Sequence, residues 1–360
     1  MPSLIKQNAN GSFLYTSDEP LLLSSGEFLP EWHLYYETFG ELSEKKDNVI
    51  VVHHALSVGS HLVSTKLNPE QGWWQQMVGA GKAIDTDHFY VICINNLGSC
   101  FGSSSPVTVN PETGKLWAGK FPQISITDMV ASQQRLLIHL EIEQLYAIIG
   151  NSLGAMLSLS WAVDFPASVK RLLLTSSCYK AYPANIANRS IQQELIRIDP
   201  NFDSGNYQSD TTLIGFKLAR KLGLFTYRNA SEWNRRFNSF DKDGMRDDEI
   251  NSYMNYNADE FCRSFDANSY LVLTTAMDLY NVTFGYDSIQ VAFSRIKAKT
   301  TVISVESDIL FTPQQQQELY QALQAGKVDC EYINHQSQYG HDSFLVEIEA
   351  FGIYLRKFLQ

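Results

Sequence analysis

Short apolar runs divide the chain, and stretches with a helical repeat lie between them. The near-continuous runs are residues 48–56, 89–97, 145–152, 169–177 and 300–307, and residues 33–40 alternate in part. Continuous apolar runs are typical of strands buried on both faces of a parallel sheet. Between two of them, apolar residues recur at spacings of three and four over 126–140 and predict a helix. The alternation predicts an α/β fold with a mostly parallel central sheet.

The middle of the chain breaks this alternation. Between about 179 and 294 there is no good buried-strand run, and several stretches have a helical pattern. We therefore expect a helical cap inserted into the sheet-bearing unit, over residues 179–294. The first part of the α/β core would comprise residues 1–178 and the second part residues 295–360.

The composition limits which classes of partner the protein could bind and in which cellular compartment it is expected. The 360 residues are 44% hydrophobic, enough for a sizeable core, and the net charge of -11 is spread along the chain. That charge disfavours nucleic acid or an anionic membrane as the main partner. There is neither a run of about 18 apolar residues nor a signal peptide, so the sequence predicts a cytoplasmic protein. The five scattered cysteines form no CxxC pair, which disfavours a disulfide framework or a structural zinc site.

A serine between two glycines is the first candidate for chemistry. Gly150, Ser152 and Gly154 fit the pattern G-x-S-x-G, with the apolar run LYAII before it and a helix-like run after it. In a nucleophile elbow, such a serine lies on a tight strand-to-helix turn and exposes its hydroxyl above the sheet. An ordinary glycine-serine turn is the alternative, because the pattern by itself is common.

A nucleophilic serine needs a base and an acid that orients the base. Asp308 follows the apolar run TTVISVES, and His341 precedes the last helical stretch. Each could instead be an ordinary polar residue at the end of a strand or the start of a helix. The chain order serine, aspartate, histidine is that of α/β-hydrolase folds, so Ser152, Asp308 and His341 together favour a catalytic triad.

Two backbone N–H groups are candidates for the oxyanion hole, and two adjacent histidines are candidates for metal ligands. The N–H of Leu153, directly after the serine, and the N–H of Leu56, in the loop after an early strand, are the predicted oxyanion donors. His53 and His54 lack accompanying Asp, Glu or Cys at ligand spacing, so we expect strand-end histidines rather than metal ligands. No metal is predicted.

Several longer stretches carry a family resemblance. They include YYETFGEL (35–42), HALSVGSH (54–61), NNLGSCFGSSSP (95–106), GNSLGAM (150–156), LARKLGLFTYRN (218–229), SDILFTP (307–313) and YGHDSFLVE (339–347). In these stretches the chain resembles the homoserine O-acetyltransferases of the α/β-hydrolase type, which catalyse the first step of one methionine biosynthesis route. The resemblance covers nearly the whole chain after residue 30.

The resemblance implies roles for further residues. Arg220 and Tyr227 fall where the family carries substrate-binding residues, and Asp342 corresponds to a carboxylate that holds the substrate amine. An amino-acid substrate does need a guanidinium for its carboxylate and a carboxylate for its ammonium. The family also implies acetyl-CoA as co-substrate without a bound cofactor, and a homodimer formed through the helical cap.

The resulting hypothesis is transfer of an acetyl group from acetyl-CoA to the side-chain hydroxyl of L-homoserine, through an acyl-serine. Succinyl transfer, a serine acceptor, an esterase, or a non-catalytic binding protein with the same fold are the alternatives. The chain departs from the family pattern at Ser57, Val58 and Gly59 and around the elbow. These departures leave the acyl donor and the acceptor open.

Overall fold

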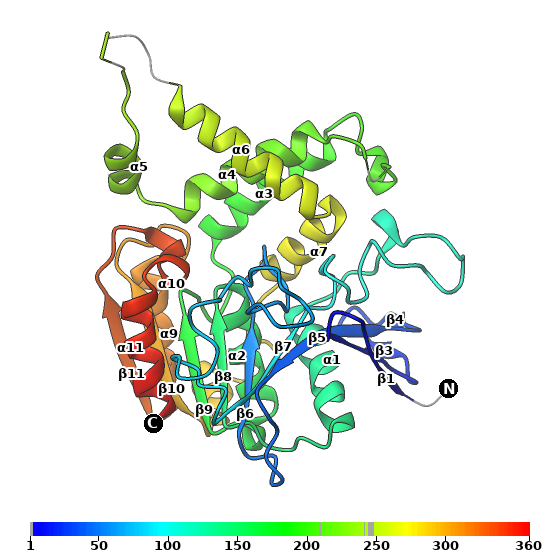
Figure 1. Ribbon diagram of the computed structural model, residues 1–360, viewed down its shortest axis with the longest axis vertical. Coiled ribbons are helices and arrows are strands. Elements are labelled where there is room, and N and C mark those ends of the chain that lie inside the picture. Colours follow the sequence, from blue (N-terminus) through cyan, green and yellow to red (C-terminus); the bar gives the residue numbers. More distant parts are fainter. Residues whose placement is uncertain (1–2, 209, 241, 244–247) are drawn as a thin grey trace.

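A nine-stranded sheet forms the centre of the computed structural model, which describes residues 3–208, 210–240, 242–243 and 248–360 (Figure 1). Its strand order is β1-β2-β5-β7-β6-β8-β9-β10-β11. The strands are β1 (Leu4–Gln7), β2 (Phe13–Thr16), β5 (His33–Phe39), β6 (Val49–His53), β7 (Tyr90–Ile94), β8 (Ala147–Asn151), β9 (Arg171–Thr175), β10 (Lys299–Val305) and β11 (Cys330–His335). A separate hairpin pairs β3 (Leu21–Leu22) with β4 (Phe28–Leu29).

The direction of the strands divides this sheet in two. From β7 to β11 every neighbouring pair is parallel, whereas β1, β2 and β5 join the sheet as antiparallel strands at one edge. Every residue of β6 and β8 is buried, as expected for strands covered on both faces. The prediction of an α/β fold with a mostly parallel sheet is confirmed. The run predicted as a strand over 48–56 is shorter in the structure, because the chain leaves the sheet after His53.

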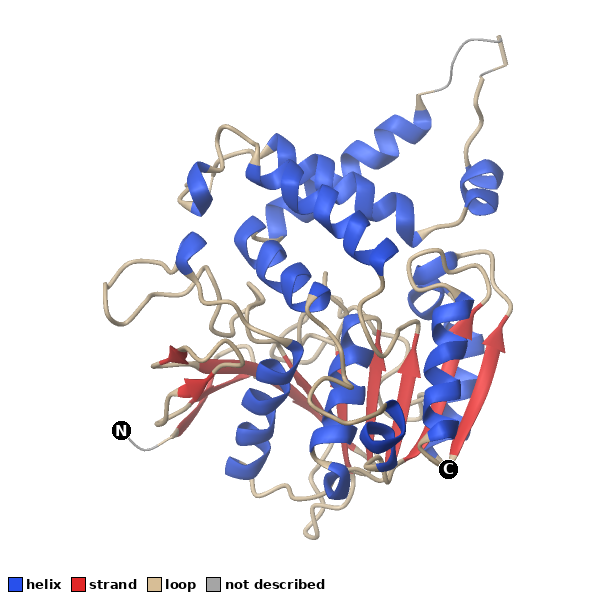
Figure 2. Ribbon diagram, turned by 180° about the vertical axis from the view of Figure 1, so that it is seen from behind, coloured by secondary structure: helices blue, strands red, loops and turns tan. Residues whose placement is uncertain are grey.

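Helices cover both faces of the sheet (Figure 2). Residues of α1 (Ile126–His139), α2 (Leu153–Asp164) and α9 (Pro313–Ala325) belong to one hydrophobic cluster, and those of α11 (Ile348–Leu359) belong to the other. At the start of α1, the Ser125 side chain accepts from the N–H of Asp128, and the Asp128 side chain accepts from the N–H of Ser125. This capping box explains where the helix predicted over 126–140 begins.

Among the described residues between β9 and β10, the regular elements are helices. These are α3 (Pro183–Arg197), α4 (Ile214–Tyr227), α5 (Ala230–Arg236), α6 (Glu249–Ser264), α7 (Ala267–Asp278) and α8 (Ile289–Ser294). We call α3 to α7 the cap helices, because they lie beyond the carboxyl ends of the parallel strands (Figure 1). The last helix, α8, packs instead on α9 of the core. Within the described ranges, no helix is both long and apolar enough to span a lipid bilayer.

Candidate active site

The turn that carries Ser152 is strained and crowded. β8 ends at Asn151, α2 begins at Leu153, and Ser152 between them has φ 56° and ψ -122°. A Cβ added at Gly150 would lie 2.3 Å from the Ser158 Oγ, and one added at Gly154 would lie 2.0 Å from the carbonyl oxygen of His53. Side chains at either glycine would therefore push strand and helix apart. This is the geometry of a nucleophile elbow, and it explains why the serine lies between two glycines.

Three loops at the carboxyl edge of the sheet bring Ser152, His341 and Asp308 together. His341 lies in a short 3-10 turn, Gly340–Asp342, between β11 and α10 (Ser343–Val346). Its Nε2 is 2.9 Å from the Ser152 Oγ, and its Nδ1 is 2.8 Å from the Asp308 Oδ2. With the proton on Nδ1, the ring donates to the aspartate and leaves Nε2 free to accept the serine proton. The three residues thus form a connected proton-transfer chain.

Asp308 is held in place by the backbone after it. Its Oδ1 accepts the N–H of Leu310 at 2.8 Å and the N–H of Phe311 at 2.9 Å. The side chain is fully buried, and Oδ2 remains for His341. The loop therefore fixes the carboxylate so that it can orient the imidazole.

The electrostatic surroundings of His341 favour its protonated form. Burial by itself would lower the pKa of the imidazole, but the charge of Asp308, its hydrogen bond and the charge of Asp342 together raise that pKa above its ordinary value. The ring is 4% exposed and packs against Phe311 and Phe344. An imidazole in this setting can accept the proton of the serine and hold it as an imidazolium ion.

A small cavity of about 60 Å³ opens beside the serine. Its lining residues are Ala55, Leu56, Ser57, Ser152, Asn188, Arg189, Gln192, Thr226, Tyr227, Tyr270, Thr274, Met277, Leu310, His341, Asp342, Phe344 and Leu345. The loop that carries Leu56 thus reaches the cavity. Leu153 is the first residue of α2, so its N–H has no acceptor within the helix. That the N–H groups of Leu56 and Leu153 stabilise an oxyanion stays a prediction.

The predicted substrate residues are distributed unequally around this cavity. Tyr227 and Asp342 line it, whereas Arg220 is not among the described lining residues. The Arg220 Nη1 is 3.4 Å from the Tyr227 hydroxyl, and its guanidinium lies 4.0 Å from the ring centre of Phe261. Asp342 also has a protein partner, because the Nε of Arg228 donates to its Oδ2 at 3.2 Å. The role of Arg220 in substrate binding stays a prediction.

Sequence reasoning missed a buried cation in the cavity. Arg189 of α3 is 4% exposed, and its Nε donates to the Oδ1 of Asp278 at 2.6 Å. Its Nη2 has no hydrogen-bond partner among the residues that the structure describes. An unsatisfied buried donor costs about 1–3 kcal/mol, and more on a charged group. The available signal was a stripe of polar residues at helical spacing, Asn185, Arg189 and Gln192, all of which are buried.

The two early histidines have full sets of partners within the protein. The His53 Nδ1 is 2.8 Å from the Ser158 Oγ, and its Nε2 is 2.8 Å from the Gln133 Oε1. The His54 Nε2 accepts the N–H of Asn96 at 3.1 Å. Burial lowers the pKa of His53 to about 3 and that of His54 to about 4, so both are neutral. In the part of the chain that the structure describes, no group of three His, Cys, Asp or Glu residues could hold a metal ion.

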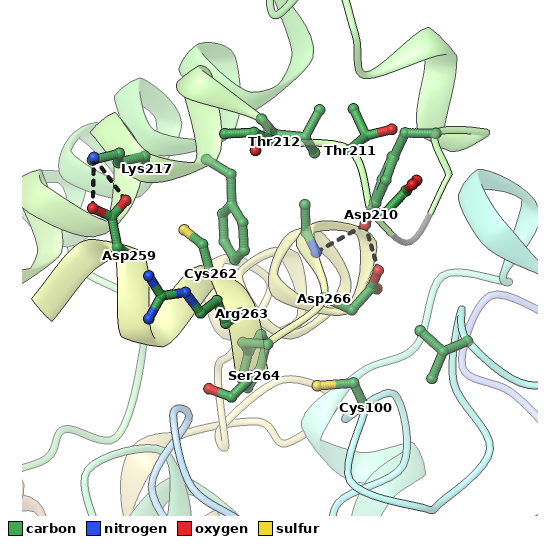
Figure 3. Close-up of a pocket in the computed structure, with 16 residues that line it drawn as sticks. Cys100, Asp210, Thr211, Thr212, Lys217, Asp259, Cys262, Arg263, Ser264 and Asp266 are labelled. Carbon is green, nitrogen blue, oxygen red and sulfur yellow. Dashed lines mark hydrogen bonds and ion pairs between the residues drawn. The ribbon is translucent and has the colours of Figure 1, made fainter. Parts of the chain in front are cut away.

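A larger groove of about 700 Å³ lies elsewhere, at the cap helices α4, α6 and α7 (Figure 3). Its lining includes Lys217, which pairs with Asp259 at 2.7 Å, and Arg263, which pairs with Glu260. Neither the serine nor the histidine of the triad lines it. The smaller cavity is therefore the candidate active site, because of these two only it is lined by Ser152 and His341.

Comparisons with known proteins agree with this geometry. A family model described as the alpha/beta hydrolase fold matches residues 48–348. A serine O-succinyltransferase of Emericella nidulans is 37% identical, with 96% of this chain and 80% of that protein covered. A homoserine O-succinyltransferase of Neisseria meningitidis serogroup B is 40% identical, with 92% of this chain and 90% of that protein covered.

Two solved structures are similar over almost the whole chain. The homoserine O-acetyltransferase from Bacillus anthracis has a TM-score of 0.88 at 26% identity and covers 99% of this chain and 98% of its own. Esterase E22 has a TM-score of 0.88 at 26% identity and covers 99% of this chain and 100% of its own.

Fold and comparisons together place the protein among the α/β hydrolases. Within that class, the chain belongs to the homoserine O-acyltransferase family and is an acyltransferase. The resemblance stated from its sequence motifs is thereby confirmed.

The raised pKa of His341 predicts the acid limb of the pH–rate profile. Only the neutral imidazole can accept the serine proton, so kcat/KM for the acyl donor should fall as the pH drops through the pKa of His341 in the free enzyme. Because that pKa is raised, the midpoint should lie above the ordinary value of about 6.5. Asp342→Asn removes a negative charge near the ring and should move the midpoint to lower pH.

The matched control is His88→Gln, since the His88 side chain is 76% exposed. This variant should leave the midpoint in place. A wild-type midpoint below about 6.5, or one that Asp342→Asn leaves unmoved, would contradict the assignment of His341 as the base.

Proposed function

We propose that this acyltransferase moves an acyl group from an acyl-CoA thioester to the side-chain hydroxyl of homoserine or serine, with succinyl-CoA as the preferred donor. One observation carries the proposal: the cavity beside Ser152 contains a buried cation, Arg189, and an anion, Asp342, in addition to the base His341. A cavity for a plain ester would need neither charge. A donor with a charged acyl group and an amino-acid acceptor would each have a charged group to pair with Arg189 or Asp342.

In the first half-reaction, Ser152 attacks the thioester carbonyl while His341 Nε2 takes the hydroxyl proton. The bond between Oγ and the carbonyl carbon forms, and the N–H groups of Leu56 and Leu153 stabilise the oxyanion. The carbon–sulfur bond then breaks, and the CoA thiolate leaves with the proton from His341. The product is an acyl ester of Ser152.

In the second half-reaction, His341 takes the proton of the acceptor hydroxyl, which attacks the acyl-serine. Collapse of the tetrahedral intermediate returns the proton to the Ser152 Oγ and releases the O-acyl amino acid. Asp342 would hold the ammonium group of the acceptor, while Arg220 and Tyr227 would hold its carboxylate. A cap that excludes water favours transfer over hydrolysis. The scheme uses no metal ion and no bound cofactor.

The choice of donor and acceptor rests on chemistry and on the relatives. The relatives from Emericella and Neisseria are named succinyltransferases, for serine and for homoserine respectively. Transfer of an acetyl group from acetyl-CoA to L-homoserine is the second candidate, supported by the fold and name of the Bacillus anthracis protein. An esterase is the remaining enzymatic alternative, since esterase E22 has the same fold.

A donor-by-acceptor matrix distinguishes these candidates. Succinyl-CoA and acetyl-CoA are each combined with L-homoserine, L-serine or no acceptor, and release of the CoA thiol is measured. Thiol release should be fastest with succinyl-CoA and should depend on one of the two amino acids. Ser152→Ala should abolish it, because loss of a triad nucleophile lowers turnover by on the order of a millionfold.

Three results of this experiment would contradict the proposal or part of it. Steady thiol release that no acceptor accelerates would show an esterase-like hydrolase. Faster turnover with acetyl-CoA would favour the second candidate. More than about a tenth of the wild-type rate in Ser152→Ala would remove the nucleophile assignment, since that loss is only about 1.4 kcal/mol of barrier.

We also propose that the protein forms a homodimer through the cap helices. Large apolar side chains are exposed on α3, directly after it and on α4, namely Ile191 (53%), Ile198 (66%), Ile214 (63%), Leu218 (44%) and Phe225 (56%). Exposed large apolar side chains are common at protein interaction sites. A second copy of the chain would cover it without a further partner.

Light scattering at micromolar concentration should give twice the mass of one chain. Ile214→Glu combined with Leu218→Glu should shift the protein toward the monomer, because an interface cannot bury two unpaired carboxylates at low cost. The control is Leu67→Glu, which changes a side chain that is 60% exposed outside the cap. A monomeric wild-type protein would refute the dimer.

A further inference from the structure

The peptide bond between Ala55 and Leu56 is held by its carbonyl end. The carbonyl oxygen of Ala55 is 2.8 Å from the Nδ1 of His54, and it also accepts the N–H of Val58 at 3.4 Å. The bond is trans and planar, so its N–H, which belongs to Leu56, points in the direction opposite to the carbonyl. The contacts of the Ala55 carbonyl therefore also set the direction of the Leu56 N–H.

The second contact of His54 fixes which ring nitrogen carries the proton. The backbone N–H of Asn96, two residues after β7, donates to the His54 Nε2 at 3.1 Å. Nε2 must therefore have a free lone pair, and the proton of the neutral ring lies on Nδ1, from which it is donated to the Ala55 carbonyl. The ring is fully buried, and burial lowers the pKa of His54 to about 4, so the imidazole is neutral at neutral pH.

The N–H end of the same peptide bond has no such partner. Among the residues that the structure describes, no backbone carbonyl accepts the Leu56 N–H. Ala55, Leu56 and Ser57 line the cavity beside Ser152, whereas His54 is not among its described lining residues. The carbonyl is thus turned toward the buried imidazole, and the N–H is turned away from it. A hydrogen bond to the carbonyl also polarises the peptide and makes its N–H a stronger donor.

A half-turn of this peptide would exchange its two ends and direct a carbonyl oxygen where the N–H is now. The oxyanion of a tetrahedral intermediate on Ser152 would then be repelled instead of stabilised. We propose that His54 is a positioning residue of the oxyanion hole, which keeps the Leu56 N–H directed at the acyl oxygen by donating from Nδ1 to the Ala55 carbonyl. This inference rests on the proposed function, because it presupposes that Ser152 carries the acyl group and that Leu56 is an oxyanion donor.

Two substitutions separate the two hydrogen bonds of His54. In His54→Asn, the amide nitrogen lies near the place of Nδ1, so the donor to the Ala55 carbonyl is kept and the acceptor for Asn96 is lost. In His54→Gln, the longer amide reaches the place of Nε2, so the acceptor for Asn96 is kept and the Nδ1 donor is lost. Each variant loses one of two buried hydrogen bonds, so the thermal unfolding midpoints of both should fall by similar amounts.

Single-turnover release of CoA, measured with succinyl-CoA and with acetyl-CoA in the absence of an acceptor, follows the first half-reaction alone. His54→Gln should lower the rate at saturating donor roughly 10- to 100-fold, because loss of a whole oxyanion donor lowers turnover roughly 100- to 1,000-fold and Val58 still holds the carbonyl in part. The half-saturating donor concentration should stay within about threefold, since the contact acts in the transition state. His54→Asn should keep the rate within about fivefold. His88→Gln, the same exchange at an exposed histidine, should change neither quantity.

The carbonyl of the acyl-enzyme reports on the oxyanion hole directly. With donors labelled with ¹³C at the thioester carbonyl, the infrared band of the acyl-Ser152 ester lies at lower wavenumber when N–H groups donate to that carbonyl. In His54→Gln the band should move to higher wavenumber, and in His54→Asn it should stay at the wild-type position. If His54→Gln does not fold, ¹⁵N NMR of the wild-type histidines still decides: the proton of His54 should be on Nδ1, and a proton on Nε2 would overturn the inference.

The outcomes separate this inference from the proposed function. If the wild type releases no CoA and shows no ester band with either donor, the proposed function fails. If the wild type forms the acyl-enzyme but His54→Gln keeps its rate within about threefold, the inference fails while the acyl-enzyme stands. Equal losses of rate in His54→Gln and His54→Asn would show that His54 only stabilises the loop. A slower His54→Gln whose ester band does not move would likewise overturn the inference.

Discussion

The tight contact between β8 and α2 at Ser152 is the constraint on which the site depends. Gly150 allows β8 to approach α2, and Gly154 allows α2 to approach the end of β6 at His53, within distances that no side chain would tolerate. Ser152 between them has a positive φ, which is unfavourable for a residue with a side chain. The strain fixes the hydroxyl at the carboxyl edge of the sheet. Parallel strands place the loops after β10 and β11 at that same edge, which is why Asp308 and His341 meet the serine from residues far apart in the chain.

The cap contributes what distinguishes this site from a bare hydrolytic triad. Its helix α3 turns Arg189, Gln192 and Gln193 inward and leaves Ile186 and Ile191 exposed, an arrangement that lowers stability unless both faces have partners. Within the protein, Asp278 accepts from the Arg189 Nε and from the Gln193 Nε2, and the Arg189 Nη2 has no partner among the described residues. A charged substrate on the inner face and a second chain on the outer face would together account for the inversion. The cap thus supplies the cation of the cavity, Arg189, and the core supplies the serine, the histidine and the anion Asp342.

Periodicity, the G-x-S-x-G motif and chain order were enough to predict the sheet, the turn at Ser152 and the meeting of Ser152, Asp308 and His341, because each depends on local pattern and on topology. The predicted strand over 48–56 was too long, since apolar residues after His53 line a loop and the cavity rather than the sheet. Arg189 was not predicted, because its partner Asp278 is 89 residues away in the chain and only the folded cap brings the two together. The motif around Arg220 indicated a substrate contact, but only the folded cap shows that this side chain lies against Tyr227 and Phe261.

The central claim is that Ser152 carries the acyl group between the two substrates, and mass spectrometry of the intact protein tests it most directly. Enzyme mixed with succinyl-CoA alone should gain the mass of one succinyl group, on the peptide that contains Ser152, and should lose it when homoserine or serine is added. The adduct should be absent in Ser152→Ala. Acyl transfer that proceeds without any adduct, or an adduct on another residue that the acceptor discharges at the turnover rate, would contradict the account.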